Sequence, residues 1–169
     1  MSENISKLKP QNRFERVREE DLNDKEKNSI IELAKLVLAK RYQPGELLTK
    51  PEDSATYLQF ILAEEEREVF GVLFLDNSHC VISFETLFFG TIDSASVYPR
   101  VVVQRALLLN AQACIVVHNH PSGTMEPSVC DRQITDKLKE ALNLLDIRLL
   151  DHFIVSTQGT LSFAEHGYI

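Results

Sequence analysis

The sequence predicts an α/β fold of the α+β kind, in which a mixed β-sheet is flanked by helices. Short apolar runs of strand length are separated by segments in which apolar residues recur at helical spacing. The first two runs are joined by a tight turn, Asn77-Ser78, which favours an antiparallel hairpin. The resulting order, helices followed by β-β-α-β-α-β-β, indicates one layered domain built on a mixed sheet.

The first third of the chain is expected to be helical after a loose arm. Residues 1–20 show no sustained period. Residues 23–42 carry apolar residues at helical spacing, and Pro44-Gly45 ends that helix. Residues 49–52 (Thr-Lys-Pro-Glu) form a capping-box pattern, which predicts the start of a second helix. The acidic run that follows at 64–66 is expected to lie in solvent.

The rest of the chain is expected to supply the sheet and two covering helices. The segment 118–127 indicates a loop, because it is rich in Pro, Gly and Asn. In chain order we expect strands at 68–76 and 80–89, a helix at 99–112, a strand at 113–117, a helix at 128–145, and strands at 147–156 and 160–163. A functional site is expected at the end of the 113–117 strand.

Length and charge set the organisation of the chain. The 169 residues, 44% of them hydrophobic, are enough for an interior that folds without disulfides. We divide them into an N-terminal arm and helix, 1–46, and a main domain, 47–169. Residues 1–50 carry 11 basic and 9 acidic side chains (+2), and residues 51–169 carry 7 and 16 (−9). The acidic part disfavours nucleic-acid binding, because it repels a phosphate backbone.

Apolar runs and cysteines bear on the compartment. No apolar run approaches the roughly 18–20 residues that cross a bilayer, so no membrane partner is expected. The first twenty residues are polar and charged, unlike a secretory signal. The three cysteines, Cys80, Cys114 and Cys130, cannot all pair with one another, so we expect free thiols in the reducing cytoplasm.

The pattern that points to chemistry is His118-x-His120, followed by Ser128 and Asp131. Side chains two apart at a strand end share one direction, so both imidazoles can point the same way. Asp131 comes early in the next expected helix, and the Pro- and Gly-rich segment between them suits a chain that doubles back. Two imidazoles and one carboxylate, with a fourth position left for water, have the composition of a catalytic zinc site.

Each part of this pattern also has a plainer interpretation. A His-x-His pair alone is more often a surface or hydrogen-bonded pair than a set of metal ligands. Ser128-x-x-Asp131 is also a helix capping box, which needs no metal. The two interpretations are compatible, because Ser128 can cap the helix while Asp131 binds a metal. The combination of a buried strand, His-x-His, a turn and Ser-x-x-Asp favours the metal site.

This combination resembles the metal-binding signature of the JAMM (MPN+) metalloproteases. The string at 118–123, His-Asn-His-Pro-Ser-Gly, is similar to that of the bacterial RadC-like proteins within that superfamily. Supporting phrases are Arg67-Glu68-Val69-Phe70, Gly90-Thr91-Ile92, Tyr98-Pro99-Arg100 and Asp151-His152. The similarity covers about residues 47–169. It implies an MPN/JAB (cytidine-deaminase-like) domain with an N-terminal helical extension.

The resemblance implies a role for each matching residue. His118, His120 and Asp131 would bind Zn²⁺. Glu68, directly before the first strand, would be the general base towards the water that the metal activates, and would pass the proton to the leaving amine. Ser128 would donate a hydrogen bond to the oxyanion. The implied function is a zinc-dependent metallopeptidase or isopeptidase that hydrolyses a peptide or isopeptide amide of a protein or peptide substrate.

Several nearby residues keep more than one interpretation. Glu68 is otherwise a solvated acid like those at 64–66, and we prefer it as the base because it alone abuts the apolar strand. Asn119 is expected to shape the loop, with bonds to the ligand histidines as the alternative. His152 is expected to be a structural histidine, with contact to the site as the alternative. Cys130 is expected to be buried, with a role as a soft metal ligand as the alternative.

Two other functions compete with hydrolysis. A DNA-repair or nucleic-acid-processing role is suggested by the family's historical name. Longer RadC-like proteins carry an N-terminal helix-hairpin-helix module, but residues 1–46 show no Gly-x-Gly hairpin between paired helices, so the chain resembles the short form. The other is a non-catalytic MPN-type interaction scaffold, although such scaffolds typically lack the ligands that this chain keeps. The sequence indicates neither the substrate nor the oligomeric state.

Overall fold

The computed structural model describes residues 17–41, 45, 51–62, 65–90 and 97–169. The chain divides into two compact units, Met1–Val37 and Leu38–Ile169. That division lies inside a helix, so the domain boundary between residues 46 and 47 stays a prediction. Every helix among the described residues is too short or too polar to cross a bilayer.

The N-terminal segment contains a short 3-10 helix, η1 (Glu19–Asp21), and the helix α1 (Asp24–Arg41). Asn23 starts α1, because its side-chain oxygen accepts hydrogen bonds from the backbone N–H groups of Lys25 (3.0 Å) and Glu26 (3.1 Å). The Glu26 carboxylate accepts a bond from the Asn23 N–H at 2.9 Å, which completes a capping box. The helix predicted at 23–42 is confirmed over its described residues.

The second unit is built on a mixed sheet, which has five strands among the described residues. Its strands are β1 (Val69–Leu75), β2 (Val81–Phe89), β3 (Ala113–Asn119), β4 (Arg148–Ser156) and β5 (Gly159–Ser162). They lie in the order β2-β1-β3-β4-β5, where β3 and β4 are parallel and the other neighbours are antiparallel. The predicted hairpin between β1 and β2 is confirmed.

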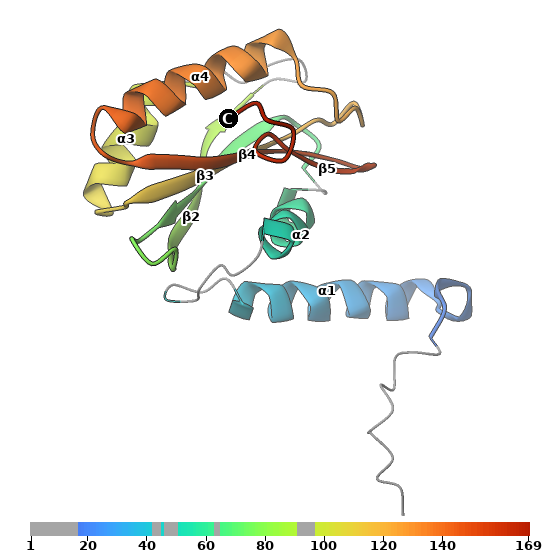
Figure 1. The fold of residues 1–169 in the computed structure, drawn as a ribbon. Coiled ribbons are helices and arrows are strands. Elements are labelled where there is room, and N and C mark those ends of the chain that lie inside the picture. The colour runs from blue at the N-terminus through green and yellow to red at the C-terminus, as the bar shows by residue number, and fades with distance from the viewer. Residues whose placement is uncertain (1–16, 42–44, 46–50, 63–64, 91–96) are drawn as a thin grey trace, which may run out of the picture. The chain divides into compact units, whose positions relative to one another are not determined.

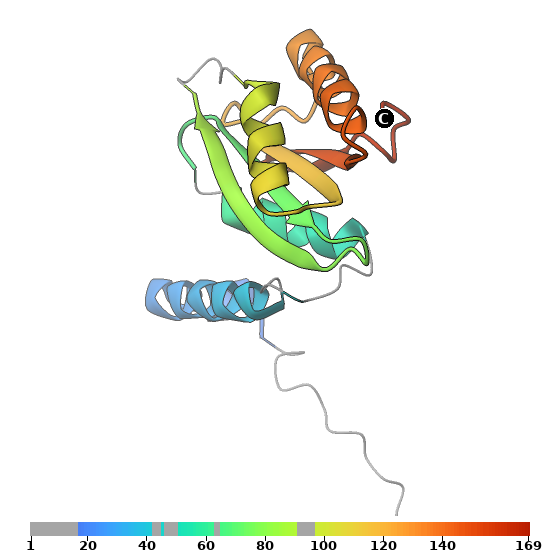
Figure 2. The same cartoon turned by 90° about the vertical axis from the view of Figure 1, so that its left-hand side faces the viewer.

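Helices cover both faces of this sheet (Figure 1 and Figure 2). The helix α2 (Pro51–Leu62) lies on one face, and α3 (Pro99–Leu108) and α4 (Val129–Asn143) lie on the other. The predicted α+β arrangement, a mixed sheet flanked by helices, is therefore confirmed. Of the capping box predicted to start α2, Thr49 and Lys50 lie outside the described residues. Of the acidic run at 64–66, Glu65 and Glu66 are exposed as predicted, and Glu64 lies outside the described residues.

Alternate side chains of β1 and β3 enter two separate cores. Odd-numbered residues pack on the side of α2, namely Val69, Leu73, Leu75, Ala113, Ile115 and Val117. Even-numbered residues pack on the side of α3 and α4, namely Phe70, Val72, Phe74, Cys114 and Val116. Because side chains alternate with a period of two, the same strand presents His118 towards α4 and Asn119 towards α2.

The strand β3 is longer than the predicted 113–117, and the predicted loop at 118–127 begins correspondingly later. His118 still pairs with Phe70 of β1 and Ile154 of β4, and Asn119 pairs with Val155. The backbone bonds to both neighbouring strands therefore extend the strand through the first histidine. The other elements lie within their predicted segments or differ at an end by one residue.

The pairing of β4 with β3 contains a one-residue irregularity. Cys114 pairs with Leu149, but the next residue of β3, Ile115, pairs with Asp151. Leu150 is therefore an extra residue, and a bulge of this kind re-aims the side chains that follow it.

The bulge decides which face His152 occupies. Before it, Leu149 packs on the side of α3 and α4, and after it Phe153 packs on the side of α2. Odd-numbered residues of β4 therefore face α3 and α4 before the bulge and α2 after it. His152, next to Phe153, points to the opposite face, towards α4. Its ring lies beside that of His118, with the two centroids 4.9 Å apart.

We expect Cys114 to resist thiol reagents in the folded protein. It is buried in the core beneath α3 and α4, and burial raises the pKa of its thiol to about 12, so the reactive thiolate is scarce. Cys130 is exposed. An aromatic disulfide reagent at mildly alkaline pH should modify Cys130 readily and Cys114 only after unfolding in guanidinium. Cys114→Ser identifies the slow site. Equal reactivity of Cys114 and Cys130 in the native protein would contradict the buried position of Cys114.

Candidate metal centre

The two histidines of the His-x-His pattern reach the site from the end of β3. His118 is the last but one residue of the strand and only 2% of its surface is exposed. Its ring stacks on Phe70 of the neighbouring strand, with centroids 6.2 Å apart and planes 15° apart. His120 follows the strand and is tied to β4, because its backbone N–H donates to the carbonyl of Val155 at 2.8 Å.

The connection after His120 turns back sharply. The Gly123 N–H donates to the carbonyl of His120 at 3.0 Å, and Gly123 has φ +87°, a conformation that suits glycine. This turn begins the return of the chain to the start of α4. The Pro-Ser-Gly sequence at 121–123 therefore forms a turn of the backbone, with glycine at the position that needs a positive φ.

The third side chain, Asp131, is set by the first turn of α4. The Ser128 hydroxyl accepts a hydrogen bond from the Asp131 N–H at 3.1 Å, and Asp131 Oδ2 accepts one from the Ser128 N–H at 2.7 Å. This is the capping box anticipated from the sequence. The box holds the carboxylate beside the helix start, with its other oxygen, Oδ1, directed at His118.

Three potential metal donors converge at this point. His118 Nε2 lies 3.1 Å from Asp131 Oδ1 and 2.9 Å from His120 Nε2. His120 Nε2 lies 3.6 Å from Asp131 Oδ2. One donor atom from each of the three residues lies within 4.8 Å of the others, so the group could hold a metal ion.

The hydrogen bonds behind the histidines fit such an ion. His120 Nδ1 lies 3.0 Å from the carbonyl oxygen of Thr124, which can only accept, so Nδ1 carries a proton and the neutral ring has its lone pair on Nε2. His118 Nδ1 is engaged too, at 2.8 Å from His152 Nε2. Both Nε2 atoms therefore face the carboxylate, and imidazole nitrogens with a carboxylate oxygen are a donor set that zinc accepts.

Charge in the site favours a bound cation. Burial opposes ionisation of Asp131, but the hydrogen bonds that it accepts from His118 and His120 when those rings are protonated outweigh it and hold the pKa of Asp131 well below its usual range. The hydrogen bond to Asp131 raises the pKa of His120 against the effect of burial, with smaller contributions that include the charge of Glu68. The site thus presents the ionised carboxylate of Asp131 beside an imidazole, His120, whose affinity for a proton is raised. Both effects favour a positive charge at this point.

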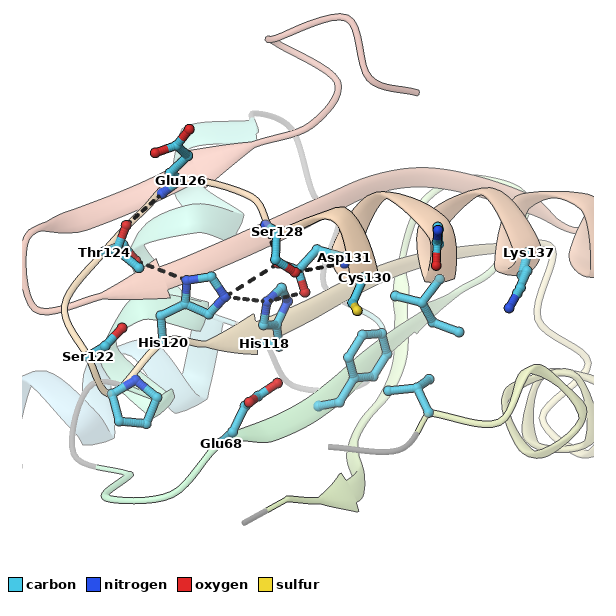
Figure 3. A pocket seen from close by; sticks show the side chains of 15 residues that line it. Glu68, His118, His120, Ser122, Thr124, Glu126, Ser128, Cys130, Asp131 and Lys137 are labelled. Carbon is cyan, nitrogen blue, oxygen red and sulfur yellow. Dashed lines mark hydrogen bonds and ion pairs between the residues drawn. The ribbon is translucent and has the colours of Figure 1, made fainter. Parts of the chain in front are cut away.

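Glu68 and Ser128 line the same pocket as these three residues (Figure 3). The pocket has a volume of about 660 Å³. Glu68 directly precedes β1 and is partly buried, and its carboxylate points towards the histidines from the side opposite α4. Ser128 is exposed at the start of α4. All five residues singled out in the sequence are therefore brought together.

Asn119 differs from its predicted role in the loop. Its side chain lies on the face of β3 opposite His118 and bonds the segment that leads into β1. Its Oδ1 accepts from the Val69 N–H at 2.8 Å, and its Nδ2 donates to the carbonyls of Glu65 (3.1 Å) and Arg67 (3.0 Å). The backbone on both sides of Glu68 is thus attached to the strand that carries His118.

His152 and Thr135 extend the polar group into the core. His152 is fully buried, and burial, aided by the charge of His118, lowers its pKa well below the usual value. Of the two interpretations for His152, contact with the site is what the structure shows. Sequence reasoning missed Thr135, although its position four residues after Asp131 on the helix places the two on one face.

Cys130 was predicted to be buried, and this is wrong. Its side chain is exposed and lines the pocket. The capping box turns Asp131 inward, and adjacent residues of a helix do not share a face, so Cys130 is not buried with it.

Comparison with known proteins gives the family. The model of the RadC-like JAB domain matches residues 48–168, which include every residue of the site. UPF0758 proteins of Vibrio cholerae serotype O1 (strain M66-2), Aeromonas hydrophila and Stutzerimonas stutzeri are each 52% identical to this chain over 141 residues. The aligned part is 83% of this chain and 63% of each relative, so the chain spans less than two thirds of their length. With the mixed sheet and the His-His-Asp group in place, these matches show that the chain belongs to the RadC-like JAB domain family.

Proposed function

We propose that this protein is a zinc-dependent metallopeptidase or isopeptidase that hydrolyses an amide bond of a protein or peptide. The observation that carries the proposal is the convergence of two imidazole Nε2 atoms and one carboxylate in a pocket that Glu68 also lines. Membership of a JAB domain family supports it. We place the reaction in the cytoplasm, where the three cysteines would stay reduced.

His118, His120 and Asp131 would hold the metal. Zn²⁺ bound there would supply a Lewis acid that brings the pKa of a water molecule to about 7 and polarises the scissile carbonyl. Three protein ligands leave one position of a tetrahedral ion open, which distinguishes hydrolytic from structural zinc sites. Burial of His118 and Asp131 would limit competition by water for two of the three ligands.

Glu68 lies where a general base is needed. Its carboxylate faces the three metal-binding side chains across the pocket (Figure 3). It would remove a proton from the attacking water and deliver it to the leaving amine. Asn119 holds the backbone on either side of Glu68. The proposed base is therefore attached to the residue that follows His118 on β3.

Ser128 would stabilise the oxyanion that forms at the scissile carbonyl. Its hydroxyl oxygen accepts the capping bond from the Asp131 N–H, and that bond does not use the hydroxyl hydrogen. The hydrogen can therefore point into the pocket and donate to a developing negative charge. The capping and oxyanion roles of Ser128 are compatible.

The competing functions have less support. Residues 51–169 carry a net charge of −9, which opposes binding to a phosphate backbone. A scaffold would make no use of a carboxylate directed at two histidines inside an open pocket. The experiments below separate hydrolysis from the scaffold role.

The first prediction concerns metal content. Protein purified without added metal should contain about one equivalent of zinc per chain, measured by inductively coupled plasma mass spectrometry. His120→Ala should lose the metal. Asp131→Asn should also lose it yet keep its helix, because an amide oxygen can accept the Ser128 N–H bond but carries no charge. His79→Asn, outside the pocket, is the control. A folded wild type that holds less than about a tenth of an equivalent and does not rebind zinc would contradict the proposal.

The second prediction concerns the base. Glu68→Gln should keep its zinc and its fold but cleave a peptide library about 100- to 10,000-fold more slowly, with products counted by mass spectrometry. Glu66→Gln, an exposed acid in the same segment, should cleave like the wild type. If Glu68→Gln cleaves at the wild-type rate, or if the zinc-loaded wild type cleaves nothing while His118→Ala unfolds, the scaffold role is favoured.

The third prediction separates the two roles of Ser128. Glycine is tolerated at a helix N-cap, so Ser128→Gly should cost only roughly a few tenths of a kcal/mol in the free energy of unfolding. It should nevertheless lower kcat/KM about 100- to 1,000-fold, because the donor to the oxyanion is gone. Ser128→Thr keeps a hydroxyl and should retain most activity. Equal activity of the Gly and Thr variants would exclude the oxyanion role.

A further inference from the structure

A buried chain of hydrogen bonds runs behind His118. His118 Nδ1 lies 2.8 Å from His152 Nε2, and His152 Nδ1 lies 2.6 Å from Thr135 Oγ1. The Thr135 hydroxyl in turn lies 2.6 Å from the backbone carbonyl oxygen of Asp131. The chain thus begins at one residue of the candidate metal centre and ends at the backbone of another.

The direction of every bond in this chain follows from its last acceptor. A backbone carbonyl can only accept, so the Thr135 hydroxyl donates its hydrogen to Asp131. The hydroxyl oxygen can then only accept from His152, which places a proton on His152 Nδ1. His152 has a single proton when neutral, so its Nε2 accepts and His118 Nδ1 must donate.

The surroundings of His152 keep it neutral and fixed. None of its surface is exposed, and its ring packs against those of Phe70 (centroids 5.6 Å apart) and Phe163 (4.6 Å). A charged imidazole in such surroundings would lose its hydration. The bulge at Leu150 directs the ring towards His118, and the backbone N–H of His152 is held by Asp151 Oδ1 at 2.7 Å.

We propose that His152 and Thr135 are positioning residues, which hold His118 as the tautomer protonated on Nδ1 and so present its Nε2 lone pair to the metal centre. The inference rests on the proposed zinc site for its effect on affinity, but the tautomer belongs to the protein itself. His120 needs no such chain, because the Thr124 carbonyl sets its tautomer directly.

Removal of the Thr135 hydroxyl should reverse the chain. In Thr135→Val the proton on His152 Nδ1 has lost its acceptor, so the ring would carry its proton on Nε2 and donate to His118 Nδ1. His118 would then be protonated on Nε2, where a metal must displace it. Contacts of this kind behind a ligating histidine typically change metal affinity about 10- to 100-fold.

The tautomers can be measured without metal or substrate. Long-range ¹H–¹⁵N correlation spectra of the full-length, zinc-free wild type should show His118 and His152 protonated on Nδ1. Thr135→Val should show both rings protonated on Nε2, and Thr135→Ser should show the wild-type pattern. His118 with a proton on Nε2 and none on Nδ1 in the wild type would overturn the proposal, and this measurement does not depend on any variant folding.

The affinity for Zn²⁺, from competition with a chromophoric chelator, gives the second readout. Thr135→Val should bind zinc about 10- to 100-fold more weakly than the wild type, and Thr135→Ser should restore binding. Ser162→Ala is the matched control, since it removes another buried hydroxyl near His152, one that donates to Asp151 rather than to this chain. A loss in Thr135→Val no larger than that in Ser162→Ala would overturn the proposal. A wild type with the expected tautomers that binds no zinc would contradict the proposed function while supporting this inference.

Discussion

Burial of β3 on both faces is the constraint on which the rest of the site depends. The strand has a paired neighbour on each side and a core on each face, so any polar side chain at its end needs a partner inside the protein. His118 contacts Asp131 and His152 on one face. Asn119 forms hydrogen bonds with the backbone at the start of β1 and before it on the other face. Two adjacent residues thereby connect the candidate metal centre and the segment of Glu68 to one rigid element.

The start of α4 supplies the second fixed point. Asp131 is held by helix-capping bonds that do not involve the histidines, so the position of its carboxylate does not depend on a bound ion. A carboxylate near a helix N-terminus is also stabilised by the unpaired N–H groups there. The same helix places Thr135 one turn after Asp131, in contact with His152. Local helix geometry therefore positions both Asp131 and the hydroxyl that contacts His152.

Much of the fold and of the site could be predicted, because the physics that fixes them is local. The period of apolar residues located the strands and helices, and the spacing of His118, His120, Ser128 and Asp131 indicated a strand end facing a helix start. What the sequence left undecided depends on pairing between distant segments. The extension of β3, the face that Asn119 occupies and the contact of His152 with His118 all follow from register, which no single segment encodes. Cys130 was misplaced for a related reason, because its exposure depends on which side of α4 faces the sheet.

The bulge at Leu150 also makes the site sensitive to strand register. If Leu150 paired with Ile115 instead of standing outside the ladder, each later residue of β4 would move one position along β3, and every later side chain of β4 would change faces. The imidazole of His152 would then enter the apolar core beneath α2, and Phe153 would pair with His118. Deletion of the extra residue would be milder, because Asp151 to Val155 would keep the partners that they have now. The site therefore depends on one unpaired residue in a strand, and a slip in register would disrupt it even if every chemical group of the pocket were retained.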